Sequence, residues 1–106
     1  MTASAFDVLA EPGRRRLLEL LLDGPRPVGE LVAAAGLSQP STSRHLRIMR
    51  EAHLVESRVD GQRRLYQLRP QGFADLAVWL APYVRLWQSS LDALEEHLDQ
   101  EGSTRA

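Results

Sequence analysis

The polar residues that could do chemistry in this sequence gather in the middle of the chain. Gln39 and Arg44 lie in a stretch with helical spacing, and their side chains suit adenine and guanine edges respectively. Ser41, Ser43 and Arg47 fall on the same helical face and suit hydrogen bonds to phosphates or to bases. This combination predicts a helix that reads double-stranded DNA.

A second basic group follows in a stretch with strand spacing. The dipeptide Asp60-Gly61 strongly favours a hairpin turn. The polar residues around it are Arg58, Gln62, Arg63 and Arg64. Cations at a hairpin tip can follow the phosphate backbone of DNA or enter its minor groove. Both alternatives stay open at this point. Neighbouring residues of a strand point to opposite faces, so one of Arg63 and Arg64 can face away from DNA, and ordinary solvent exposure is the alternative for each residue of the group.

Other kinds of site are poorly supported. The chain has no cysteine, which excludes disulfides, thiol nucleophiles and thiolate metal sites. No paired carboxylates, catalytic triad or phosphate loop can be assembled, so we expect no enzyme and no cofactor. His45 lies on the helix of Arg44, and His53 is expected to cap the end of that helix.

The net charge of −1 hides an uneven distribution along the chain. Residues 14–69 carry 11 arginines and 6 acidic residues, a local charge of +5, whereas the segments before and after them have charges of −2 and −4. A basic middle between acidic ends predicts one surface for a polyanion and another for a different task. All 13 basic residues are arginine, which suits contacts to phosphate and guanine, although a genome rich in G and C is the simpler explanation.

Two helices are expected before the basic segment. Ser4 and Asp7 resemble a capping box for a short first helix that ends before Pro12. Pro12 suits the first turn of a second helix, and Gly24-Pro25 stops it. The apolar face predicted for the second helix consists of Leu17, Leu18, Leu20, Leu21 and Leu22.

A helix-turn-helix follows. A short helix is expected over residues 27–35, with Gly36 as its left-handed C-cap. Ser38 then caps a helix whose inward stripe is Thr42, Leu46 and Met49. Two short helices joined by Gly-Leu-Ser, the second one polar and basic on its outer face, are typical of this DNA-binding motif.

The remaining residues predict a wing and a long helix. Alternating residues on both sides of the Asp60-Gly61 turn predict a two-stranded β wing. The last helix has a heptad-like apolar stripe and should kink near Pro82. This stripe consists of Phe73, Leu76, Leu80, Tyr83, Trp87, Leu91, Leu94 and Leu98.

The fold class expected is therefore mainly α with a two-stranded β wing, in a winged helix-turn-helix arrangement of four helices, two strands and a fifth helix. We expect one DNA-binding and dimerisation domain over residues 1–101 and a flexible tail over residues 102–106. Met1 to Ala10 lacks the features of a secretory signal, and no stretch is long and apolar enough for a membrane span. A cytoplasmic protein is expected.

The sequence resembles the ArsR family of bacterial winged-helix repressors. The resemblance is densest over residues 5–69 and is most specific in the segment Leu-Ser-Gln-Pro-Ser-Thr-Ser-Arg-His-Leu, which starts at Leu37. It implies a homodimer that places two recognition helices in successive major grooves of a palindromic operator. It also adds Ser38 and Pro40 to the expected DNA contacts, and it implies a dimer interface formed by the first and last helices. The interface residues expected are Phe6, Leu9, Leu80, Tyr83, Trp87, Leu91, Leu94 and Leu98.

Many members of this family sense metals, but the ligands implied by the resemblance are missing here. The stretch that matches the cysteine pair of metalloid sensors contains no cysteine, and Asp75 is not followed by the histidines of zinc-type sensors. His97, the one histidine on the last helix, is expected to be a solvated side chain. We therefore expect no metal site, and the sequence names no small-molecule effector.

Three alternatives stay open. Trp79, Tyr83 and Trp87 could line a small-molecule pocket at the dimer interface, which would make the protein a ligand-responsive repressor. A winged-helix protein-interaction module is disfavoured, because residues 38–69 carry 7 arginines against 3 acidic residues. For the run Arg14-Arg15-Arg16 we favour pairing with Glu11, Glu19 or a partner subunit over contact of one member with a phosphate.

Overall fold

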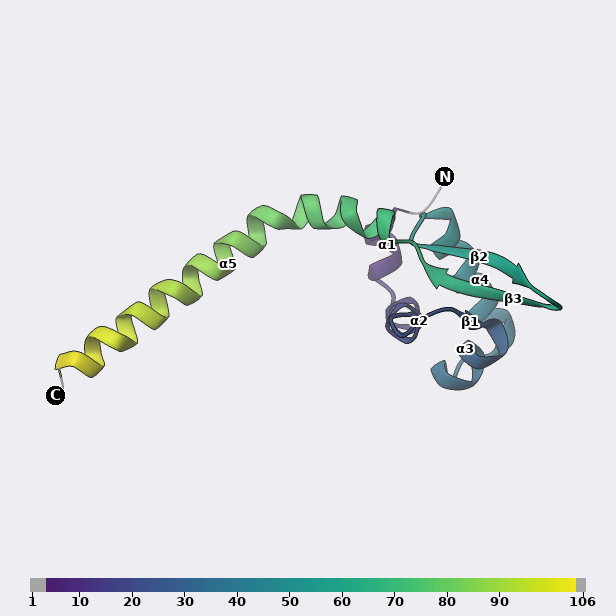
Figure 1. The fold of residues 1–106 in the computed structure, drawn as a ribbon, viewed down its shortest axis with the longest axis horizontal. Coiled ribbons are helices and arrows are strands. Elements are labelled where there is room, and N and C mark those ends of the chain that lie inside the picture. Colours follow the sequence, from purple (N-terminus) through teal and green to yellow (C-terminus); the bar gives the residue numbers. More distant parts are fainter. Residues whose placement is uncertain (1–3, 105–106) are drawn as a thin grey trace. The chain divides into compact units, whose positions relative to one another are not determined.

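The computed structural model describes residues 4–104. In chain order its elements are α1 (Ala5–Leu9), α2 (Pro12–Leu21), β1 (Arg26–Pro27), α3 (Val28–Ala35), α4 (Gln39–Glu51), β2 (Val55–Asp60), β3 (Arg63–Leu68) and α5 (Pro70–Thr104) (Figure 1). This is the winged helix-turn-helix fold predicted from the sequence. The chain divides into two compact units, Met1–Ala74 and Asp75–Ala106, because most contacts between residues fall within one unit or the other. The two units are described separately below.

The first two helices begin at the predicted caps. The Ser4 hydroxyl accepts a hydrogen bond from the Asp7 N–H at 3.2 Å, and the Asp7 carboxylate accepts one from the Ser4 N–H at 2.9 Å. These reciprocal bonds complete a capping box. Glu11 caps α2 by accepting from the backbone N–H of Arg14 at 3.0 Å, and Pro12 fills the first position of the helix.

The helix-turn-helix forms as its caps predict. Gly36 ends α3 in the left-handed conformation, with φ of 68°. Ser38 begins α4, where its hydroxyl accepts from the Ser41 N–H at 3.2 Å. Thr42 is fully buried, and its hydroxyl donates to the Ser38 carbonyl oxygen at 2.9 Å, so burial leaves no unsatisfied donor there.

The end of α4 determines where the wing starts. His53 has φ of 62°, and its N–H donates to the Arg50 carbonyl at 3.0 Å, while the Leu54 N–H donates to the Met49 carbonyl at 3.0 Å. This pair of bonds is a Schellman motif, which confirms the capping role predicted for His53. Leu54 is fully buried, so the connection is held by both hydrogen bonds and packing.

The sheet contains one strand more than predicted. β2 and β3 form the expected antiparallel hairpin, but β1 pairs with the outer side of β3, which gives the order β1-β3-β2. The turn is also shifted by one residue from the prediction. Asp60 pairs with Arg63, so the two loop residues are Gly61 and Gln62. Gly61 has φ of 64°, as the first loop position of a tight hairpin requires.

The core of the first unit is formed by residues from its helices and both wing strands. Its buried apolar residues are Val8, Leu17, Leu18, Leu21, Leu31, Leu46, Met49, Leu54, Val55 and Leu65. The inward stripe predicted for α4 is confirmed. The prediction for Leu22 was wrong: its side chain is 73% exposed, because Leu22 is the C-cap of α2 and lies beyond the last residue of the buried face.

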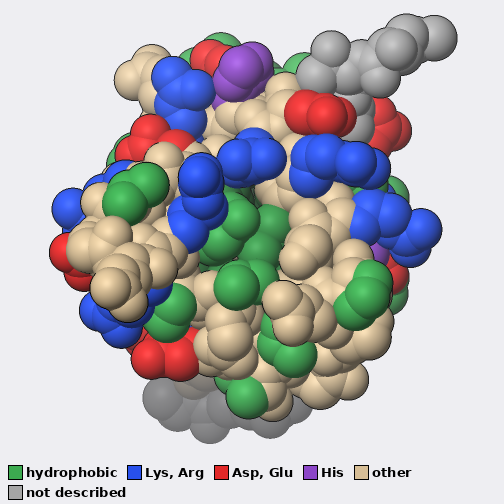
Figure 2. All heavy atoms as spheres, turned by 90° about the vertical axis from the view of Figure 1, so that its right-hand side faces the viewer, with side chains coloured by type: hydrophobic (Ala, Val, Ile, Leu, Met, Phe, Trp, Pro, Cys, Tyr) green, Lys and Arg blue, Asp and Glu red, His purple; other side chains and the backbone are tan. Residues whose placement is uncertain are grey.

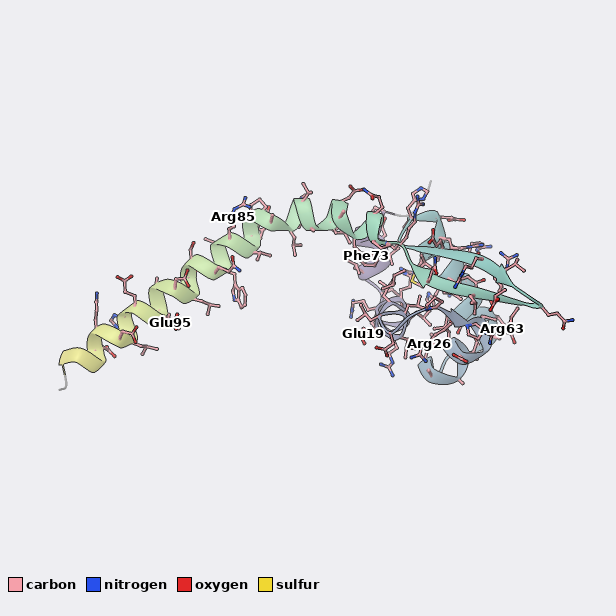
Figure 3. All side chains as sticks on the ribbon, in the orientation of Figure 1. Glu19, Arg26, Arg63, Phe73, Arg85 and Glu95 are labelled. Carbon is pink, nitrogen blue, oxygen red and sulfur yellow. The ribbon has the colours of Figure 1, made fainter. Side chains whose placement is uncertain are left out.

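The second unit consists of the rest of α5. The helix continues through Pro82 without ending, and it bends near Arg85, less than one turn further on (Figure 3). It extends to Thr104, so residues 102–104 are helical. The single-domain boundary at residue 101 and the flexible tail remain predictions, and residues 105 and 106 of that tail lie outside the described residues. No helix in the described part of the chain is long and apolar enough to cross a membrane.

Candidate nucleic-acid interface

One face of α4 is buried in the core, and the opposite face is exposed to solvent. Thr42, Leu46 and Met49 are each at most 1% exposed, which fixes the rotation of the helix about its axis. The opposite face carries most of the predicted DNA contacts. The exposed members are Gln39, Pro40, Ser43, Arg44 and Arg47, together with the N-cap Ser38, and Ser41 is half-buried. These side chains therefore lie together on the outer face of the predicted recognition helix.

On the buried side of α4, His45 contacts the N-cap of α2. It is 6% exposed, and its Nε2 lies 3.6 Å from Oε2 of Glu11, the N-cap of α2. Burial, the largest influence, lowers the pKa of His45 below its usual 6.5, although Glu11 acts in the opposite direction. Arg14 and Arg44 also lower it. Within residues 4–104 the buried Nδ1 has no hydrogen-bond partner, and a neutral ring is the form that this environment favours.

The wing places its predicted contacts on two faces. In the β2–β3 register, Val59 lies opposite Arg64, whereas Arg58 lies opposite Leu65. Directly opposed residues of antiparallel strands share a face, so Arg64 and Arg58 point to opposite sides of the wing. Arg63 pairs with Asp60 at 3.5 Å, and Gln62 is exposed in the turn.

A groove separates α4 from the wing. It has a volume of about 440 Å³ and is lined by Pro40, Ser43, Arg44, Arg47, Arg50 and Tyr66. Figure 2, which faces the side of the first unit from which the wing projects, shows basic side chains gathered in a band across that side. None of the described residues that line the groove is acidic, so its electrostatic field favours an anion.

Arginines elsewhere in the first unit have partners within the chain. Arg14 donates to the carbonyl oxygens of Asp7 and Val8 at 3.0 and 3.2 Å. Arg15 donates to that of Leu9 at 2.6 Å. These carbonyls end α1, where a cation stabilises a helix. Ion pairs join Arg16 to Glu19 and Arg26 to Asp23. The run Arg14-Arg15-Arg16 thus has the structural role we favoured, mainly through backbone carbonyls.

The arginines of α4 and the wing have few charged partners within residues 4–104. Among the described residues, no carboxylate lies within ion-pair distance of Arg44, Arg47, Arg50, Arg58 or Arg64. Their charges are therefore available to an external polyanion. The gathering on α4 and the wing of arginines that lack a carboxylate partner in the described residues is the geometric observation that most favours a nucleic-acid surface.

Three residues of this surface were missed at the sequence level. Arg50 and Tyr66 line the groove, and Ser57 accepts hydrogen bonds there from both Arg50 and Arg64. The spacing of Arg44, Arg47 and Arg50 is the signal that could have found the first, because residues three apart form one ridge on a helix. Ser57 and Tyr66 could not be found in this way, because they belong to this surface only through the way the wing lies against α4.

The apolar residues predicted for dimerisation are mostly exposed. Phe6 is 48% exposed on α1, and Leu9 is half-buried. The six α5 members, Leu80, Tyr83, Trp87, Leu91, Leu94 and Leu98, are all exposed. Trp79 and Tyr83 contact each other, with ring centroids 4.9 Å apart. In residues 4–104, no group of three or more potential metal ligands comes together.

A model of bacterial regulatory proteins of the arsR family matches residues 11–57, from the N-cap of α2 into β2. HTH-type transcriptional regulator Rv2034 of Mycobacterium tuberculosis is 40% identical over 98 residues, which cover 92% of this chain and 89% of that protein. The chain belongs to the ArsR family. It is accordingly a DNA-binding transcriptional regulator rather than an enzyme.

Two solved structures are similar to this ArsR-family chain. One is the homodimeric winged helix-turn-helix DNA-binding domain of Mb0332 from Mycobacterium bovis, with a TM-score of 0.62 and 28% identity over 76% of this chain and 74% of that one. The other is the transcriptional repressor BigR from Xylella fastidiosa, with a TM-score of 0.60 and 32% identity over 74% of this chain and 80% of that one.

Proposed function

We propose that this ArsR-family protein is a repressor that binds a palindromic operator as a homodimer. The observation that carries the proposal is the basic groove beside α4, which is lined by Arg44, Arg47 and Arg50 and by no acidic side chain of the described residues. Arg64 faces the same side, and within residues 4–104 none of these four arginines has a carboxylate at ion-pair distance. A dimer seated on an operator would block access of RNA polymerase to the promoter. The protein would act where the chromosome is, in the bacterial cytoplasm.

The outer face of α4 supports base recognition in the major groove. Gln39, Ser43 and Arg44 lie in its first two turns, the part of a recognition helix that reaches base edges. Arg44 suits guanine and Gln39 suits adenine. Arg47 lies one turn further along, where a phosphate contact is expected. Three residues at the start of the helix, Ser38, Pro40 and Ser41, accompany them, with Ser38 also serving as N-cap.

The wing supports contacts beside the major groove. Arg64 faces the α4 groove, and Gln62 is exposed in the turn. Arg58 is also exposed, and it forms no ion pair with any described residue. Arg63 is the weakest candidate, because its guanidinium already pairs with Asp60 at 3.5 Å. An exposed ion pair of this kind contributes little to stability, so a DNA phosphate could replace Asp60 as the partner of Arg63 at a small cost in free energy.

Exposed apolar surface supports the homodimer. The six α5 residues of the stripe are between 44% and 62% exposed, which is unusual for a contiguous row of large apolar side chains. The first unit separately carries a mainly apolar groove of about 250 Å³, lined by Leu9, Arg15, Leu18, Glu19, Leu22, Leu68 and Phe73. Glu19 and Phe73 are labelled in Figure 3. A second copy would cover such surfaces, and two-fold dimers are the commonest solution. The homodimeric domain and the repressor named above are consistent with this choice.

The test is a gel-shift assay on the DNA that flanks the protein's own gene. Specific binding should persist in excess mixed-sequence competitor DNA and should weaken steeply as the salt concentration rises. Absence of any salt-sensitive, sequence-specific complex there and across the genome would contradict the proposal.

A further inference from the structure

The C-terminal end of α4 and the wing share a polar cluster outside the base-reading residues. Arg50, in the last turn of α4, donates from Nη1 to Oγ of Ser57 at 3.4 Å. Arg64, on β3, donates from Nη1 to the same oxygen at 3.1 Å. Two guanidinium groups from different elements therefore converge on one hydroxyl.

This convergence brings together charges that the chain does not neutralise. Within the described residues, neither Arg50 nor Arg64 has a carboxylate at ion-pair distance, although Arg63, the next residue along the chain, pairs with Asp60. Like charges held this close repel each other. An anion between them would turn the repulsion into two charge-assisted hydrogen bonds.

The hydrogen-bonding capacity of the cluster indicates what kind of anion fits. Each guanidinium has five N–H donors and no acceptor, and Ser57 uses only one donor of each. The Ser57 oxygen accepts from both arginines, so its own O–H remains to donate. A cluster that offers only donors suits a group that only accepts, such as the charged oxygens of a phosphodiester.

The cluster lies at the end of a row of arginines that a bound DNA strand could follow. Arg44, Arg47 and Arg50 lie at three-residue spacing on α4 and line the same groove, so a sugar-phosphate backbone that contacts Arg47 beyond the base-reading Arg44 would continue to Arg50. We propose that Arg50, Ser57 and Arg64 together hold one backbone phosphate of the bound duplex, an inference that rests on the proposed DNA-binding function. It assigns Arg64 to the phosphate backbone rather than to the minor groove.

The experiment measures the affinity of the full chain for a mixed-sequence duplex of about 30 base pairs, long enough for both half-sites, as a function of salt. A mixed-sequence probe is suitable because phosphate contacts do not depend on sequence. The variants are Arg50→Ala, Arg64→Ala and their combination. Arg16→Ala, which removes one charge from an exposed pair outside the groove, is the matched control. Unfolding and sedimentation of each variant verify its fold and dimerisation.

The slope of log affinity against log salt should fall by about 1.8 in the double variant, which loses one phosphate contact in each of two protomers. Each single variant should lose at most this much, and the double variant should not approach the loss of about 3.6 expected for two separate phosphates in each protomer, because both arginines hold the same phosphate. Ser57→Ala should reduce the affinity less than either arginine change. Arg16→Ala should retain the wild-type slope.

Two results would overturn the inference. If the double variant has the same slope as Arg16→Ala, the cluster contacts no phosphate. If each single variant loses about 1.8 and the double variant about 3.6, the arginines contact separate phosphates. In both cases Arg44→Ala would still weaken binding to a selected operator, so the proposed function would stand. Failure of the wild-type chain to bind any duplex would instead remove the proposed function itself.

Discussion

In the proposed function, Arg44 is the residue on which base reading most depends. It is exposed in the second turn of α4 and has no carboxylate partner among the described residues. Arg44→Ala should weaken binding to the selected operator by about 1–3 kcal/mol per half-site and relax the base preference at one position. Competition gel shifts against operator variants measure both effects. Arg16→Ala serves again as the control, and an unchanged operator affinity for Arg44→Ala would place the recognition face elsewhere.

His45 makes the anchoring of α4 sensitive to pH. Because burial lowers the pKa of His45 in the folded protein below 6.5, the unfolded chain binds a proton first as the pH falls. The stability that the neutral ring contributes is therefore present above about pH 6.5 and is lost as the pH falls from there towards the folded-state pKa. The backbone N–H of Arg14 lowers the pKa of Glu11 below 4.5, and its contribution is lost in more acidic solution.

We expect the free energy of unfolding to fall between about pH 7.5 and pH 5.5, with a shallower decline in His45→Gln, which cannot take up a proton. Urea unfolding at a series of pH values measures this. If the free energy of unfolding falls equally steeply with decreasing pH in the wild-type protein and in the variant, His45 does not cause the decline.

At the level of elements, the start of α5 is pressed against the α4–β2 connection. A Cβ on Gly72 would clash with the backbone carbonyl of His53 and would lie 3.0 Å from Cδ2 of Leu54. Helix propensity alone favours alanine over glycine by about 0.5–1 kcal/mol. The backbone clash should outweigh this gain, since overpacking typically costs about 1–3 kcal/mol.

Gly72→Ala is therefore expected to destabilise the fold, whereas Gly29→Ala should stabilise it by up to about 1 kcal/mol. Gly29 is a matched control, because it also lies in a helix, α3, and its Cβ would meet nothing within 4 Å. Denaturant unfolding compares the two variants. Equal stability gains for both would contradict the packing described at Gly72.

The helices were predictable from the sequence because their signals are local. Ser4, Pro12, Gly36 and Ser38 act within one turn of their own positions, and each marks a helix boundary in the structure. β1 was not predictable in this way. Its two residues have no strand periodicity, and they become a strand only by pairing with Tyr66 and Leu65, which are distant in sequence.

The candidate site was predictable to a similar extent. Periodicity is enough to place Gln39, Arg44 and Arg47 on the outer face of α4. The convergence of Arg50 and Arg64 on Ser57 depends on how the wing lies against α4, which no local pattern specifies.

For the whole molecule, the apolar stripe of α5 is the feature on which the proposed homodimer depends. Leu91→Glu introduces a charge into this stripe and should convert the dimer to a monomer, because burying an unpaired carboxylate costs several kcal/mol. Ser89→Glu is the matched control, since two residues apart on a helix places the same charge on nearly the opposite face. Analytical ultracentrifugation distinguishes the two states. A dimeric Leu91→Glu protein would remove Leu91 from the interface.

The most direct test of the account is a footprint of the purified protein on the genomic fragments that it retains in competition with mixed-sequence DNA. The account predicts salt-sensitive protection of an inverted repeat whose half-sites are spaced by whole turns of the duplex, about 34 Å each. Arg44→Ala should abolish this protection, whereas Arg16→Ala should leave it intact. Protection without two-fold symmetry, or no sequence-specific protection at any site, would contradict the claim that this protein is a dimeric operator-binding regulator.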